Sequence, residues 1–545
     1  GLGGTTYQGE ESGRAYEGVD LSRDTVCRRE QTLNRLLKCL LEKRIILVRS
    51  PPMTGKTTLS QLFEHNLLQS RSRVFRISLL WMERRNPSFT FEKGFEDLMK
   101  MTWPGFLDQC GQKETFLIVD EVQKIYKPEN EDEPRHGGKV FWDPFKVIMQ
   151  TTRLYIVAFA SYGHYGAYTA RGDHAVIDIS SYHLPESNAW GFADVRFTEE
   201  EFCDYFDRFC EKNLKMLQKE DTPLFSRYVS AITAFHPGLV VFTMEQIHAR
   251  FVKHTFESLT FSKIFAYLKS RDFNAHFEDL RAMPRITDMS DEEKKIVDTV
   301  LFKKRGLKIK TNAIPRERRI IKTNILVDTV ITKNYSILDF PAPLLRATYL
   351  QNRFGSVTRS KTPPNTFRDF VTSVFAKMDP KVLQKSKGTG IDGRLLGRVW
   401  QMEFYRASMQ VLPEDIHASV DVGAVFGSKG YIDFYIDDQH NWAIELLRDG
   451  DRLQEHEERF QERGIYVPIL KYAKEWAVID IRSNTKGFPE GHGKDVIYVV
   501  CAENFESVQL MYSDGTKVNV RLLGEEENLL GFDISEFLED SMETD

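Results

Sequence analysis

Short runs of apolar residues alternate with amphipathic stretches through the first third of the chain. Each run is continuous rather than alternating, which is typical of parallel strands buried on both faces. A helix is predicted ahead of the first run, with apolar residues at helical spacing at Leu33, Leu36 and Leu40, and helical stretches separate the later runs. Strands that alternate with helices predict an α/β domain built on a parallel sheet. The predicted strands are 45–48, 74–80, 116–119 and 154–159.

The pattern changes after Thr198, where the strand signals fade. Phe202, Tyr205, Phe206 and Phe209 recur at helical spacing and favour amphipathic helices. This stretch is typical of a helical lid on the preceding domain.

The second half of the chain begins with a helix, a basic stretch and two strand-like runs, 324–330 and 335–340, which predict a winged-helix-like module. The turn-forming residues at 362–365 indicate a linker. From there to about Arg482, helices and strands alternate again and predict a second α/β domain.

Composition places the chain among multidomain globular proteins. Its 545 residues exceed what one core usually supports. Hydrophobic residues at 41% and charged residues at 28% are ordinary for a soluble protein. No apolar run reaches the length of about 18 residues that a membrane span needs, so no membrane contact is expected. Six scattered cysteines without a C-x-x-C pair favour a reducing compartment.

The formal net charge of −5 hides an uneven distribution. The segment 484–545 ends in an acidic tail. A basic segment could contact nucleic-acid phosphates or be a solvated face, and the sequence leaves both open. Its residues are Lys303, Lys304, Arg305, Lys308, Lys310, Arg316, Arg318, Arg319 and Lys322.

A phosphate-loop motif follows the first predicted strand. Ser50 stands where the pattern G-x-x-x-x-G-K-[ST] has its first glycine. Gly55 lets the backbone approach phosphates, Lys56 can bridge β and γ oxygens, and Thr57 can bind Mg²⁺. The motif therefore predicts ATP or GTP as ligand, with Mg²⁺. The predicted binding residues are Ser50, Pro51, Pro52, Met53, Thr54, Gly55, Lys56, Thr57 and Thr58.

Further candidates for the nucleotide site come later in the chain. The strand at 116–119 ends in Asp120, predicted to hold Mg²⁺ with Thr57, and Glu121, predicted to polarise the attacking water. Ser161 follows the next strand and could sense the γ-phosphate. His236 and Pro237 interrupt the predicted lid, as in the lid motif of AAA-like and signal-transducing NTPases. The alternative for the last pair is a simple interhelical turn.

A second group of acidic residues lies toward the C-terminus. Restriction-endonuclease-like folds carry a helix acid, an Asp on one strand and an E-x-K on the next, because carboxylates hold Mg²⁺ beside the scissile phosphate. Glu403, Asp433 and Glu445 fit this order, and Asp433 and Glu445 are the predicted metal ligands. Leu447 occupies the lysine position. Arg448, Lys429 or Lys471 could replace that lysine in space.

The helix that follows places His456 and Arg459 three residues apart, so both can face the same site. There they could bind phosphate or polarise water. The alternative to a catalytic site is that the acids simply lie at strand ends and that His456 lies on a helix surface.

Taken in order, the phosphate loop, Asp120-Glu121, His236-Pro237-Gly238, Asp433 and the Glu445 strand resemble the effector region of the Crinkler family. The resemblance implies a P-loop NTPase coupled to a restriction-endonuclease-like nuclease. It also implies secretion by the producing organism, entry into a host nucleus, and DNA damage or cell death there.

The sequence supports two hypotheses of function. The first is an NTP-dependent, metal-dependent nuclease acting on double-stranded DNA. The second is a nucleotide-dependent signalling switch whose degenerate nuclease domain binds DNA or a protein without cutting. Homo-oligomers and host nuclear proteins are further expected partners.

The predicted fold class is α/β multidomain, with an AAA- or STAND-like parallel sheet and lid ahead of the other units. The predicted boundaries are an N-terminal linker at 1–23, a P-loop NTPase core at 24–195, a helical lid at 196–285, a winged-helix-like basic module at 286–355, a restriction-endonuclease-like domain at 356–483 and an acidic extension at 484–545.

Overall fold

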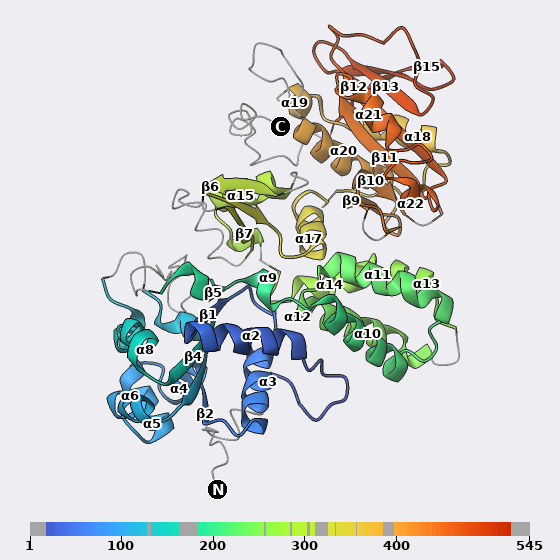
Figure 1. Ribbon diagram of the computed structural model, residues 1–545. Coiled ribbons are helices and arrows are strands. Elements are labelled where there is room, and N and C mark those ends of the chain that lie inside the picture. Colours follow the sequence, from blue (N-terminus) through green and yellow to red (C-terminus); the bar gives the residue numbers. More distant parts are fainter. Residues whose placement is uncertain are drawn as a thin grey trace.

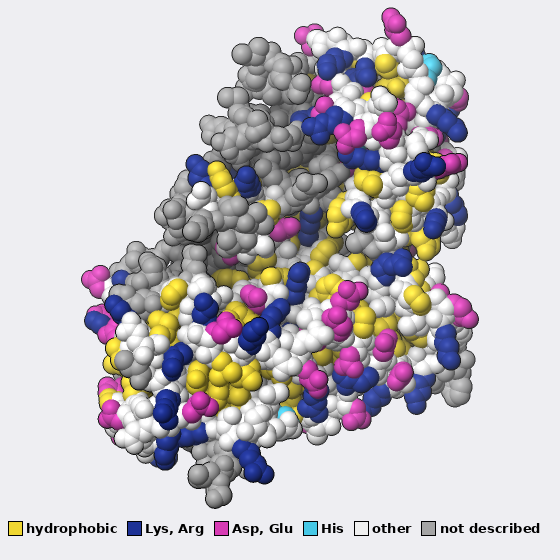
Figure 2. Space-filling model, in the orientation of Figure 1, with side chains coloured by type: hydrophobic (Ala, Val, Ile, Leu, Met, Phe, Trp, Pro, Cys, Tyr) yellow, Lys and Arg dark blue, Asp and Glu magenta, His cyan; other side chains and the backbone are white. Residues whose placement is uncertain are grey.

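The computed structural model arranges the chain as a parallel-sheet domain, a helical lid, a small three-stranded module and a mixed-sheet domain (Figure 1). None of the described helices is long and apolar enough to cross a bilayer. On the face shown in Figure 2, acidic and basic side chains are interspersed. The structure describes residues 18–127, 132–162, 184–254, 258–283, 286–301, 306–310, 325–332, 334–355, 357–384, 397–423, 426–437 and 439–524.

The first domain is built on a five-stranded parallel sheet in the order β2-β3-β4-β1-β5. The four predicted strands are confirmed as β1 to β4, with β4 lying between β1 and β3. The strand predicted at 74–80 ends earlier, because the Ser78 hydroxyl accepts a hydrogen bond from the Leu80 amide at 3.2 Å and starts a helix. The strands are β1 (Ile45–Arg49), β2 (Val74–Ser78), β3 (Thr115–Asp120), β4 (Leu154–Ala160) and β5 (Ala189–Trp190).

Helices cover both faces of this sheet, as continuous apolar strands require. One face carries an aromatic-rich core that includes Phe95 and Trp103, whose rings meet edge to face with centroids 5.0 Å apart. On that side lie α4 (Leu79–Arg85), α5 (Phe91–Met99), α6 (Trp103–Gln112), α7 (Lys139–Trp142) and α8 (Phe145–Thr151). On the other lie α2 (Glu30–Lys43), α3 (Lys56–Gln69) and α9 (Phe192–Val195).

The stretch with helical spacing folds as the helices of the lid. Thr198 and Glu201 form a capping box at its first helix, since each side chain bonds the other's backbone amide. The lid helices are α10 (Glu199–Asn213), α11 (Thr222–Thr233), α12 (Pro237–Phe251), α13 (Phe261–Leu268) and α14 (Arg271–Glu278).

The small module has a three-stranded antiparallel sheet in the order β6-β8-β7. Of the basic segment, Lys308 and Lys310 lie on β6, while the other seven residues fall outside the described part of the chain. Its elements are α15 (Asp291–Leu301), β6 (Leu307–Lys310), β7 (Val327–Thr332), β8 (Tyr335–Asp339) and α17 (Pro343–Phe354).

The last domain contains a seven-stranded mixed sheet, ordered sequentially from β9 to β15. Strands β9, β10 and β11 are antiparallel, and β11, β12 and β13 are parallel. The domain consists of α18 (Phe367–Ala376), α19 (Pro380–Gln384), α20 (Gly397–Val411), β9 (Ala418–Val422), β10 (Ile432–Ile436), β11 (Trp442–Arg448), α21 (Leu453–Glu458), α22 (Val467–Leu470), β12 (Glu475–Arg482), β13 (Val496–Cys501), β14 (Ser507–Met511) and β15 (Lys517–Arg521).

The predicted boundary between a domain at 356–483 and an extension at 484–545 does not match this sheet. Val478 on β12 pairs with Val496 on β13, so the strands assigned to the extension continue the sheet of the preceding domain. The acidic tail beyond residue 524 lies outside the described residues.

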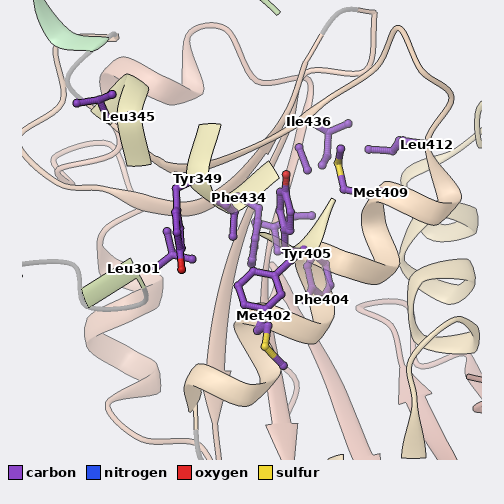
Figure 3. Packing of buried hydrophobic residues seen from close by; sticks show 14 of the residues in the cluster. Leu301, Leu345, Tyr349, Met402, Phe404, Tyr405, Met409, Leu412, Phe434 and Ile436 are labelled. Atoms are coloured by element: carbon purple, nitrogen blue, oxygen red, sulfur yellow. The ribbon is translucent and has the colours of Figure 1, made fainter. Parts of the chain in front are cut away.

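One continuous apolar core joins the lid, the small module and the mixed-sheet domain. Leu301 of α15, Tyr349 of α17 and Phe434 of β10 belong to it (Figure 3). Helix α17 packs between α11 of the lid and α20 of the mixed-sheet domain. These three parts are therefore packed against one another through a shared core.

A buried ion pair fastens the lid to the parallel-sheet domain. Arg29, directly before α2, donates from Nε to the Glu201 carboxylate at 3.0 Å, and both side chains are almost wholly buried. The same guanidinium donates to the carbonyl of Val195, and Thr32 donates its amide to Glu201. The residues at the start of α2 and the start of α10 are therefore held together by a buried network in which each of these polar groups has a hydrogen-bond partner.

Replacing Arg29 by methionine should destabilise the protein by about 3–5 kcal/mol, because the buried Glu201 carboxylate loses its counter-ion. The change is measured as a shift of the first unfolding transition in urea. Arg250→Met, which removes an exposed pair with Asp272, is the control and should cost about 0–1 kcal/mol. Equal shifts for the two variants would contradict a special role for the buried pair.

Candidate functional site

The phosphate loop joins the end of β1 to the start of α3. Gly55 has φ +82° and lies directly before the helix, which begins at Lys56. Ser50, at the position of the missing glycine, is fully buried, and its hydroxyl hydrogen-bonds that of Thr54. The Thr54 hydroxyl also bonds the Pro51 carbonyl at 2.9 Å. Ser50 thus stabilises the loop from inside.

The remaining residues of the motif lie along the same loop and helix. Met53 has φ +64°, a left-handed conformation that helps to fold the loop back on itself. Pro52 and Thr58 are half-buried, Pro52 in the loop and Thr58 in the first turn of α3.

Lys56 is the chemically distinctive group of this loop. Its ammonium donates to the carbonyls of Ser50 and Pro51 at 2.9 and 2.8 Å, and within the described residues no carboxylate lies within ion-pair distance. Burial lowers the pKa of Lys56 to about 8, while the charges of Glu121 and Asp120 oppose that shift. A half-buried ammonium whose hydrogen bonds go to neutral carbonyls favours an anionic ligand.

The acidic pair at the end of β3 faces this loop. Thr57 donates its hydroxyl to Asp120 at 2.7 Å, which brings the two predicted Mg²⁺ ligands together. Burial and the charge of Glu121 raise the pKa of Asp120 to about 6. Glu121 has φ +61°, and Gln123 donates to its carboxylate.

Ser161 lies in the site because it directly follows β4, the strand between β1 and β3. Its amide donates to the Gln123 side chain at 3.3 Å, and its carbonyl accepts from Tyr126 at 2.8 Å. Gln123 therefore links Ser161 to Glu121. No sequence signal singled out Gln123, whose role depends on the order of strands in the sheet.

The N-terminus of α12 packs directly on the phosphate loop. A Cβ on Gly238 would come within 2.0 Å of the Met53 carbonyl oxygen, and one on Gly55 would contact Pro237 at 3.5 Å. The structure thus brings His236 and Pro237 beside the loop. Gly238, which lies next to the predicted pair but was not itself a predicted site residue, permits the contact.

His236 is the N-cap of α12 and is fully buried. Its Nδ1 accepts from the Leu239 amide at 3.3 Å, whereas Nε2 has no hydrogen-bond partner in the described part of the chain. Burial lowers the pKa of His236 to about 3, so its imidazole is neutral near pH 7. Because Nδ1 accepts a hydrogen bond, Nε2 of the neutral imidazole carries the proton and can donate one further hydrogen bond there.

The carboxylates predicted for the second site have separate partners. Asp433 accepts from the Leu446 amide at 2.7 Å and from Gln401 at 3.1 Å. It lines a small cavity that Arg346 also lines. Glu445 is fully buried and accepts from His456 at 2.6 Å and from Arg459 at 2.9 Å. His456 and Arg459 therefore meet on one helix face, as their spacing predicts.

Glu403 does not join this group. Its carboxylate accepts from Arg406 and from the Asp379 amide, the latter at 2.7 Å, and it is fully buried. Residues two apart on a helix point roughly 200° from each other, so Gln401 reaches Asp433 while Glu403 faces away. The prediction that Glu403 shares the site is wrong in this structure, and Gln401 was missed.

Arg448 also lies away from Glu445. Three positions separate them on β11, and alternate residues of a strand point to opposite faces. Arg448 therefore does not replace the missing lysine beside Glu445, whereas Leu447, on the Glu445 face, packs in the apolar core of the outer sheet face. Within the described residues, no group of three or more His, Cys, Asp or Glu side chains is placed to hold a metal ion.

No protein family or curated protein matches the sequence. Solved structures resemble the fold distantly. A Walker-type ATPase of Pyrococcus abyssi is 16% identical over 60% of this chain and 98% of its own, with a TM-score of 0.34. The Thermotoga maritima RuvB Holliday junction branch migration motor is 10% identical over 57% and 91%, with a TM-score of 0.28. AMPPCP-bound DnaA from Aquifex aeolicus is 16% identical over 46% and 70%, with a TM-score of 0.28.

The class of the first domain follows from its own geometry. In this parallel sheet the phosphate loop follows β1, the acidic pair stands at the end of β3, and β4 lies between those two strands. This is the arrangement of P-loop NTPases. A separate mixed α/β domain follows it in the chain.

Gly238→Ala should weaken nucleotide binding roughly tenfold to a hundredfold, because overpacking of about 1–3 kcal/mol would displace the phosphate loop. Binding is measured by titration with a fluorescent ATP analogue. The control is Gly111→Ala in α6, where an added Cβ has no neighbour within 4 Å. Unchanged affinity in the Gly238 variant would show that the loop does not depend on this contact.

Proposed function

We propose that this protein is a nucleotide-dependent switch that hydrolyses ATP or GTP and transmits the nucleotide state through its lid to the mixed-sheet domain. The observation that carries the proposal is the packing of α12 on the phosphate loop, with Gly238 against Met53. Any change in the loop on binding or hydrolysis would bear on this helix.

The residues of the loop fit a nucleotide with Mg²⁺. Lys56 would pair with phosphate oxygens in place of the two carbonyls, and Thr57 and Asp120 would hold the metal ion, which neutralises phosphate charge when bound. Glu121 is positioned to accept a proton from water, and its carboxylate is oriented by Gln123.

The lid has a direct polar contact with the mixed-sheet domain. Lys269, at the end of α13, donates to the Ser419 hydroxyl on β9 at 2.6 Å and lies 4.0 Å from the Asp437 carboxylate after β10. Helix α11 packs beside α12 and against α17. A displacement of α12 would therefore reach the last domain through α11, α17 and Lys269.

Glu121→Gln should lower hydrolysis by about 10²–10⁴-fold while nucleotide binding persists, because the amide cannot accept the proton. Phosphate release and analogue binding are measured on the same preparations. Lys56→Ala, the comparison variant, should lose binding itself. Hydrolysis at the wild-type rate in the Glu121 variant would remove that residue from the mechanism.

A metal-dependent nuclease is the second candidate, favoured by the order of α20, β9, β10 and β11 and by Asp433 and Glu445 on neighbouring strands. The switch is the stronger proposal because Glu445 is held by His456 and Arg459 rather than open to metal and DNA. The resemblance to Crinkler effectors adds the proposal that either activity is directed at a host nucleus.

If the switch proposal is right, the purified protein with Mg²⁺ and ATP should leave supercoiled plasmid intact on an agarose gel. Nicking by the wild type that disappears in Asp433→Asn, but persists in a variant of the exposed Asp451, Asp451→Asn, would instead establish the nuclease.

A further inference from the structure

A large pocket lies where the lid meets the mixed-sheet domain. It contains about 1220 Å³ of space, part of it open to solvent. Its walls come from α11, α13 and α14 on one side and from α20, β9 and β10 on the other, with α17 between them (Figure 1). The phosphate loop contributes no residue to it, so the pocket is distinct from the nucleotide site.

Aromatic rings from both sides line this pocket. Tyr228 and Phe265 of the lid meet edge to face, with centroids 5.2 Å apart. On the other side, Phe426 and Tyr435 lie with centroids 5.1 Å apart, and Tyr405 of α20 and Tyr431 also line the pocket. Aromatic walls with a few fixed polar groups are typical of sites for flat organic ligands.

Two amides present a donor and an acceptor in the same pocket. Asn274 of α14 donates to the Gln351 side chain of α17 at 2.6 Å. This leaves the Asn274 oxygen and the Gln351 nitrogen without a hydrogen bond to any described residue. Reversing both amides would exchange the two roles and leave the same pair.

The charges that line the pocket balance. Lys269 is paired with Asp437 and Ser419 across the junction. Burial, with the charges of Lys269 and Arg359, lowers the pKa of His417 to about 3, so its imidazole is neutral. No hydrogen bond joins that ring to the described residues. The pocket therefore suits an uncharged, planar ring with alternating donors and acceptors on its edge.

We propose that this pocket binds a nucleobase, with Asn274 and Gln351 pairing with its edge and the tyrosines packing on its faces. The base can come from a free nucleoside or from a single-stranded nucleic acid, because both present the same chemistry. Since the walls belong to two parts of the chain, such a ligand would favour the arrangement in which the lid and the mixed-sheet domain meet.

The test is calorimetric titration of the full chain with adenosine, guanosine, cytidine, uridine and thymidine, and separately with short single strands of DNA and RNA. Gln351→Leu should weaken binding about tenfold by removing a donor. Ala347→Trp, at an exposed position on the pocket wall, should block it while leaving the fold intact. Gln384→Leu, on the exposed side of α19, is the matched control and should bind as the wild type does.

Each outcome decides the proposal. Saturable binding of a nucleoside that both pocket variants weaken supports it and identifies a free ligand. Binding confined to the strands, again lost in both variants, supports it and identifies a nucleic acid as the source. Absence of saturable binding, or binding that Gln351→Leu and Ala347→Trp leave unchanged, overturns it.

Discussion

The contact between the start of α12 and the phosphate loop is the constraint on which the rest of the structure depends. The Met53 carbonyl lies where any side chain at position 238 would have to stand, so only glycine lets the helix approach. This approach places the lid on the phosphate loop and buries His236 beside it, near the half-buried Lys56. The shape of the phosphate loop and the position of the lid are consequently coupled, so neither can change without the other.

A second constraint links the position of the lid to the mixed-sheet domain. The apolar core that begins in the lid continues through Tyr349 of α17 to Phe434 of β10 without interruption. Dense cores deform little, so under the proposed switch a shift of α12 would be passed on through this core rather than absorbed locally. The Arg29–Glu201 pair opposes such a shift, because it fastens α10 to the segment before α2.

The parallel sheet could be predicted because its signals are local. Continuous apolar runs define β1 to β4, and the phosphate loop follows β1 as a contiguous motif. The boundary of β2 could not be fixed, since the competing signal was a single side-chain cap at Ser78. Gly238 and Gln123 were missed for a different reason: their roles arise from the approach of segments that lie far apart in sequence.

In the candidate C-terminal site, too, the contacts between distant segments could not be predicted from the sequence. The spacing of His456 and Arg459 correctly places both on one helix face, because helical phase is local. Residue type alone favoured Glu403 over Gln401, yet helical phase decides which of the two reaches Asp433. The alternation of β11 likewise separates Arg448 from Glu445. Sequence order places the candidate acids on these elements, whereas side-chain direction decides which residues contact Asp433 and Glu445.

The burial of these carboxylates bears on what the last domain does. Glu403 and Glu445 are fully buried, and each is compensated by a guanidinium within hydrogen-bond distance. A buried carboxylate stripped of its partner is costly, so neither is released to a metal ion without rearrangement. The lid reaches this domain at Ser419 and Asp437, on β9 and after β10, whereas the helix that holds Glu445 is α21. In the proposed switch, movement of the lid would act on the β9 edge and on the pocket there before it acted on Glu445, an order that favours a response by binding rather than by cutting.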